Sequence, residues 1–184
     1  RLAGGMAKNI YAMTGAWDPK RPTEGAFTAL MNFETGCIAN LTYSGYAHFD
    51  SDIWMNDVGE LGQRKQPGAY GGARRALMDL DPEEEARLKT TRTFGGGKTV
   101  DAKHNEHFGP VIALCDRADL KLTPDGIEVF GDTERSFIEA KFGPAPRRTV
   151  IDALVAAVRE DEPPVQTGEW GLASLEVCHA ILQA

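Results

Sequence analysis

The stretch that most constrains the fold is 25–46, which has the pattern of two strands joined by a tight turn. Between residues 27 and 33, every odd-numbered residue is apolar, and this repeat of two residues is the period of a β-strand. Gly36 closes the sequence Glu34-Thr35-Gly36, where a tight loop needs positive φ. β-favouring residues resume at 37–46. We therefore expect a long antiparallel hairpin.

This hairpin is expected to carry apolar side chains on both faces. Leu30 and Leu41 are out of phase with Phe27 and Phe33, so we expect them on the opposite face. A sheet that is apolar on both sides needs a cover on each side, because large apolar patches are seldom left in water. We expect helices on one face and a second copy of the protein on the other.

Composition narrows the classes of protein to which the chain can belong. It has 184 residues, 42% of them hydrophobic and 26% charged, with a formal net charge of −7. An acidic chain is a poor match for nucleic acid or an anionic membrane, and no apolar run approaches the roughly 18 residues of a membrane span. Three cysteines in apolar runs, Cys37, Cys115 and Cys178, predict buried free thiols and a cytoplasmic location.

Further elements follow from periodicity and from capping residues. The pattern predicts strands at 6–15, 53–55, 110–115, 119–122, 127–130 and 135–142, and helices at 82–89, 148–160 and 168–184. Because strands come first and helices last, we expect an α+β fold with an open, largely antiparallel sheet and helices packed on one face. The whole chain, 1–184, is expected to be one domain. A Gly-rich excursion at 59–109 within it is either a functional lid or disordered.

A glycine run at the end of the excursion resembles a phosphate-binding loop only superficially. The phosphate-loop motif needs a glycine where Arg92 stands before Gly95-Gly96-Gly97-Lys98-Thr99. No G-x-G-x-x-G sequence of the dinucleotide-binding kind is present either. The chain is therefore not expected to bind a nucleotide by these motifs.

Two histidines and a group of basic residues are the candidate site residues. His104 and His107 lack a third ligand at a recognisable spacing, so no metal site is expected, and a metal-dependent enzyme is the weakest alternative. A general base or a substrate hydrogen bond remains open for them. Basic side chains in an acidic chain are either solvated loop charges or contacts to a substrate carboxylate. The candidate substrate-binding residues are Arg74, Arg75, Lys98, His104 and His107.

Several stretches resemble a known family of enzymes. Residues 168–182, Gly-Glu-Trp-Gly-Leu-Ala-Ser-Leu-Glu-Val-Cys-His-Ala-Ile-Leu, resemble the C-terminal helix of the Gfo/Idh/MocA oxidoreductases, and 29–39 resembles a strand pair of the same family. The stretches His107-Phe108-Gly109-Pro110, 115–120 and 124–132 are similar to those of phthalate 4,5-cis-dihydrodiol dehydrogenases and their relatives. The resemblance implies the second, C-terminal domain of a two-domain enzyme.

The resemblance also implies what the chain itself lacks. In the family an N-terminal Rossmann domain binds NAD or NADP and supplies a catalytic Lys, and an acid/base His with an Asp lies just before the position of Arg1. No catalytic or cofactor-binding residue is therefore expected in 1–184, and the fragment alone is expected to be inactive and to bind no cofactor. The full protein would oxidise a cis-dihydrodiol of an aromatic carboxylate to a catechol and assemble as a homo-oligomer through the sheet. The alternative is a non-catalytic ligand-binding or assembly domain.

Overall fold

The computed structural model describes residues 2–19, 21, 25–46, 48–91, 102–141, 143 and 148–183, without the side chain of Ala73. Lys98 and the glycine run around it lie outside the described residues. Contacts divide the chain into two compact units, one formed by 1–48 and 150–184 and the other by 49–149. The single domain expected for 1–184 stays a prediction.

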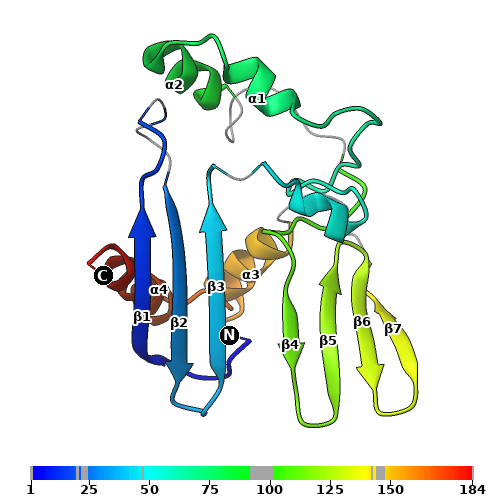
Figure 1. Cartoon of the computed structure of the whole chain (residues 1–184). Helices are drawn as coiled ribbons and strands as arrows, with labels where there is room; N and C mark the ends of the chain where they lie inside the picture. The colour runs from blue at the N-terminus through cyan, green and yellow to red at the C-terminus, as the bar shows by residue number, and fades with distance from the viewer. Residues whose placement is uncertain are drawn as a thin grey trace. The chain divides into compact units, whose positions relative to one another are not determined.

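The first unit is built on the expected hairpin, extended by one strand. Its sheet has the order β1-β2-β3, all antiparallel, with β1 at Ala7–Gly15, β2 at Ala26–Phe33 and β3 at Ile38–Ser44 (Figure 1). The β2–β3 turn places Gly36 at φ 84°, and its N–H donates to the carbonyl of Phe33 at 3.0 Å. The hairpin prediction is confirmed.

The two faces of this sheet differ from the expectation at one residue. Leu41 pairs with Ala29, so Leu41 lies on the same face as Phe27 rather than opposite to it. The register set by the tight turn decides this, since a shift of one residue would reverse every side chain. Ala29 and Met31 on that face are 2% and 6% exposed. The opposite face, called the open face below, carries the exposed apolar side chains Tyr11, Met13, Leu30 and Ile38.

Helix α4, Gly168–Leu182, packs against β1 and buries Ile181 (Figure 1). Its first turn is capped by the Thr167 hydroxyl, which accepts from the N–H of Trp170 at 3.2 Å. Helix α3, Arg148–Arg159, has the expected amphipathic pattern but no buried residue. Cover of the sheet by α4 is confirmed, whereas cover by α3 stays a prediction.

The second unit contains a four-stranded antiparallel meander in the order β4-β5-β6-β7 (Figure 1). Its strands are β4 Ile112–Leu114, β5 Ala118–Thr123, β6 Gly126–Gly131 and β7 Arg135–Glu139. The β5–β6 turn lies at the expected Thr-Pro-Asp-Gly sequence, with Pro124 fully buried and Gly126 at φ 156°. The prediction of an antiparallel α+β fold is confirmed, with the strands divided between two sheets.

Among the described residues, three short helices precede the meander. The expected strand at 53–55 is instead a 3-10 helix, η1, at Ser51–Met55, because the Asp50 carboxylate accepts from the N–H of Asp52 and starts a helical turn. Helix α1, Gly72–Leu77, was not expected from the sequence. Helix α2, Pro82–Thr90, begins with the expected cap at Asp81 and buries no side chain.

Two predictions from composition can be compared with the structure. Cys37, Cys115 and Cys178 are free, but all three are exposed rather than buried. The reason is position, because Cys37 follows the β2–β3 turn, Cys115 follows the three-residue strand β4, and Cys178 lies on an uncovered side of α4. Among the described helices, none has the length and apolar character that a bilayer span requires.

Candidate functional site

The two candidate histidines, His104 and His107, lie where segment 102–109 crosses segment 58–65. The backbone N–H groups of Lys103 and His104 both donate to the carbonyl of Gly62 at 3.1 Å, and that of His107 donates to the carbonyl of Glu60 at 3.1 Å. Gly62 has φ +78°, and a Cβ there would lie 2.2 Å from the carbonyl oxygen of His104. Only glycine permits so close a crossing. This crossing of 58–65 and 102–109 is called the junction below.

At the junction His104 is tied to the β5–β6 turn. Its Nδ1 lies 2.5 Å from Oδ1 of Asp125. The neighbouring Asn105 side-chain amide donates to the carbonyls of Pro124 at 2.9 Å and Ala140 at 3.0 Å. The His104 side chain is 19% exposed, and none of the described residues bonds its Nε2. The pair is an imidazole held in one orientation by a carboxylate, with one ring nitrogen left for another partner.

His107 has a different environment, because both of its ring nitrogens are occupied. Nδ1 accepts from the backbone N–H of Gly109 at 3.1 Å, so the ring proton is on Nε2, which donates to the carbonyl of Val58 at 2.8 Å. Val58 is fully buried. His107 therefore joins two segments of the backbone, and its expected contact with substrate stays a prediction that this geometry does not favour.

A second polar cluster, which sequence reasoning missed, surrounds Lys65. Its ammonium group lies 2.6 Å from the Asp50 carboxylate and 2.7 Å from that of Asp52, and this arrangement is called the Lys65 clamp below. The hydrogen bond from Lys65 lowers the pKa of Asp50. Burial lowers the pKa of Lys65, but its hydrogen bonds to both carboxylates reverse this, so the pKa lies above its ordinary value. The only sequence signal was an Asp-x-Asp pair near a lysine.

The clamp holds a turn that displays apolar side chains. Phe49 and Trp54 have ring centroids 5.0 Å apart and, with Ile53, are each more than half exposed. Met55, at the end of the same turn, is 1% exposed and anchors it. Aromatic side chains displayed on a fixed turn are suited to packing against a flat ring or another protein surface.

The two candidate arginines lie on α1. Arg74 is half-buried and engaged in an interaction, and Arg75 is exposed. Within the described part of the chain, the structure brings His104 and His107 together at the junction but shows no contact of either arginine with them. Nor do the described residues include a group of three His, Cys, Asp or Glu side chains that could hold a metal ion.

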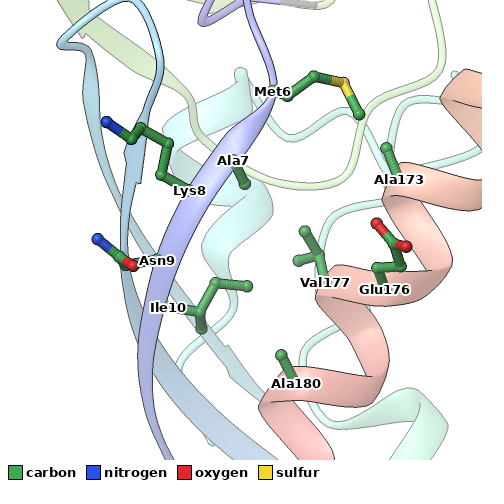
Figure 2. A pocket seen from close by; sticks show the side chains of 9 residues that line it. All are labelled: Met6, Ala7, Lys8, Asn9, Ile10, Ala173, Glu176, Val177 and Ala180. Carbon is green, nitrogen blue, oxygen red and sulfur yellow. The ribbon is translucent and has the colours of Figure 1, made fainter.

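The first unit has a shallow groove of about 260 Å³ between β1 and α4. In Figure 2 the side chains of Met6, just before β1, and of Ala7 and Ile10 in β1 are directed toward the helix. Those of Lys8 and Asn9 point to the other side of the strand. The helix presents mostly small side chains there: Ala173, Val177 and Ala180, with Glu176 beside them. The groove is a gap left by small residues, with Glu176 as its acidic group.

Comparison with known proteins shows which proteins the chain resembles. No family model matches the chain. It is 38% identical, over 189 aligned residues and 99% of its length, to a 1-carboxy-3-chloro-3,4-dihydroxycyclo hexa-1,5-diene dehydrogenase of Comamonas testosteroni. The chain is related to dehydrogenases. It spans 47% of that relative, so about half of the relative's length has no counterpart in the chain.

Solved structures give the same result. A presumed dehydrogenase from Bordetella bronchiseptica RB50 matches 97% of the chain with a TM-score of 0.81 and 40% identity, and the chain covers 47% of it. Biliverdin reductase from Synechocystis sp. PCC 6803, solved with biliverdin and NADP+, matches 96% of the chain with a TM-score of 0.53 at 13% identity, which shows the fold alone. The resemblance to a C-terminal domain of the Gfo/Idh/MocA oxidoreductases is confirmed.

Proposed function

We propose that this chain is the substrate-binding and oligomerisation domain of an NAD(P)-dependent oxidoreductase. The full protein oxidises a cis-dihydrodiol of an aromatic carboxylate to a catechol in the cytoplasm. The observation that carries the proposal is the 38% identity, along 99% of the chain, to a dehydrogenase named for a carboxylated dihydroxycyclohexadiene. Hydride transfer belongs to the nicotinamide cofactor, which the residues outside this chain are expected to bind.

The substrate's carboxylate gives the basic residues a role. Arg74 and Arg75 are adjacent on α1, and a guanidinium group can bind a carboxylate through two parallel hydrogen bonds. Lys98 follows on the same excursion and is part of the same proposal. The exposed ring pair of Phe49 and Trp54 supports a site for a flat ring in this unit.

A kinetic comparison in the full-length protein tests this function. The wild type should reduce NAD+ or NADP+ with 1-carboxy-3-chloro-3,4-dihydroxycyclohexa-1,5-diene as substrate. Arg74→Ala and Arg75→Ala should each raise KM by about tenfold or more, because each removes a charge-assisted hydrogen bond. Arg87→Ala on the exposed helix α2 is the matched control and should leave KM unchanged. A wild type without this activity would exclude the function, and unchanged KM in both α1 variants would exclude these arginines as contacts.

A further inference from the structure

The histidine–carboxylate pair at the junction allows one residue to be given a specific role in substrate recognition. This role rests on the proposed function. We infer that His104, held by Asp125, is the acceptor that recognises a hydroxyl group of the diol. Asp125 is a positioning residue for it. His107, three residues later, serves the fold.

The orientation of the His104 ring is set by Asp125. Nδ1 of His104 lies 2.5 Å from an Asp125 carboxylate oxygen, and an ionised carboxylate can only accept. Nδ1 therefore carries the ring proton in the neutral imidazole, and Nε2 has an unshared electron pair. A neutral ring held this way is an acceptor for an O–H group at Nε2.

The position of the ring is determined by the chain around it. The His104 N–H donates to the Gly62 carbonyl, and Asn105 makes side-chain bonds to both Pro124 and Ala140. Gly62 has φ +78° and leaves room for the carbonyl of His104 that no Cβ would leave. Four segments thus meet to hold one imidazole, which is the preorganisation that recognition of a small polar group requires.

The two histidines differ in how their ring nitrogens are bonded. Among the described residues, His107 uses both ring nitrogens, on Val58 and Gly109, whereas His104 uses one and leaves Nε2 unbonded. The His104 side chain is 19% exposed, so a small molecule can reach the ring although most of it is covered. A diol supplies the O–H donor that this nitrogen lacks.

Binding of product analogues to the full-length protein tests the inference. The protein, saturated with NADH, is titrated with 3,4-dihydroxybenzoate and with benzoate, which share the carboxylate and the ring but differ in the hydroxyls. His104→Leu should weaken binding of 3,4-dihydroxybenzoate by about tenfold to a hundredfold, because a hydroxyl would be buried without its acceptor. Binding of benzoate should stay within about twofold, which also shows that the variant is folded. His104→Gln, which keeps an acceptor oxygen, should lose less.

A second variant tests Asp125 by a spectroscopic signature. Asp125→Asn can donate to Nδ1 and so favours the tautomer with the proton on Nε2, where the ring no longer accepts. Nitrogen-15 spectra of the imidazole, assigned by the loss of signal in His104→Gln, should show the proton on Nδ1 in the wild type and on Nε2 in this variant. The preference for 3,4-dihydroxybenzoate over benzoate should fall with that change.

The possible results distinguish a failure of the role inferred for His104 from a failure of the proposed function. A wild type that binds neither compound and oxidises no dihydrodiol would overturn the proposed function and this inference with it. If the wild type binds both, equal losses for the two compounds in His104→Leu, or no loss for either, would overturn the inference alone. A wild-type ring with its proton on Nε2 would overturn it as well.

Discussion

At the scale of single residues, the Lys65 clamp joins three charged groups. One ammonium group bridges two carboxylates on the turn that carries Phe49 and Trp54. Removal of the cation leaves two like charges close together and partly shielded from water. The clamp should therefore matter more for stability than the ion pairs on exposed helices.

We expect Lys65→Met to lower the free energy of unfolding by about 1–2 kcal/mol, a value reduced for solvent screening of a partly exposed group. Lys89→Met, which breaks the pair with Glu85 one turn earlier on α2, is the matched control and should change it by less than about 0.5 kcal/mol. Urea unfolding of both variants gives the comparison. Equal effects would mean that the clamp is an ordinary surface pair.

The clamp should also respond to pH at both extremes. The pKa of Asp50 is lowered from 3.8, so its contribution is present above that value and is lost as pH falls through the lower folded pKa. The pKa of Lys65 is raised from 10.5, so its contribution is present below that value and is lost as pH rises through the higher folded pKa. The stability difference between wild type and Lys65→Met should be flat from about pH 5 to 9 and shrink outside this range. A constant difference down to the acid limit would contradict this.

At the scale of elements, glycines decide how closely two segments can approach. Gly62 and Gly36 have similar positive φ, +78° and +84°, but different surroundings. A Cβ on Gly62 would meet the backbone carbonyl of His104 at 2.2 Å, whereas one on Gly36 would meet nothing within 4 Å. The two positions form a matched pair that separates backbone strain from steric overlap.

Gly36→Ala should cost about 1 kcal/mol, the strain of a left-handed backbone. Gly62→Ala should cost roughly 2–4 kcal/mol, because the junction must also open. Thermal unfolding gives both values, and the imidazole spectrum of His104 should change only in Gly62→Ala. If the two glycine variants lost the same stability, the close crossing at the junction would be wrong.

At the scale of the whole molecule, we expect a partner to cover the open face of the three-stranded sheet. Tyr11, Met13, Leu30 and Ile38 are between 47% and 75% exposed on it, and apolar surface of this kind marks interfaces. Self-association through this face is part of the proposed function. A symmetric contact would let the same four side chains meet their own copies.

We expect the wild type to have at least a dimeric mass by light scattering at micromolar concentration. Leu30→Asp should reduce it to the monomer, since an unpaired charge would be buried in the interface. Met78→Asp places the same charge on an exposed apolar residue of the other unit and should leave the mass unchanged. A monomeric wild type would refute the assembly.

Particular residues show what local patterns can predict. The hairpin around Gly36, the capped start of α2 at Asp81 and the turn before Gly126 all depend on neighbours within a few residues, so periodicity and capping rules predict them. The prediction of a strand at 53–55 was wrong, because three residues are too few to distinguish a strand from a helical turn that Asp50 caps. Exposure of the cysteines depends on what covers each element, which no local pattern records.

Local sequence patterns are enough to predict the strand hairpins, the two closing helices, the antiparallel α+β class and the relation to dehydrogenases. These follow from short-range periodicity and from stretches similar to a family. Three features could be seen only in the folded chain: Leu41 shares a face with Phe27, Lys65 lies between two aspartates, and His104 contacts Asp125 while His107 contacts Val58. Each of these depends on strand register or on contacts between residues 13 to 49 positions apart, where local propensity has no influence.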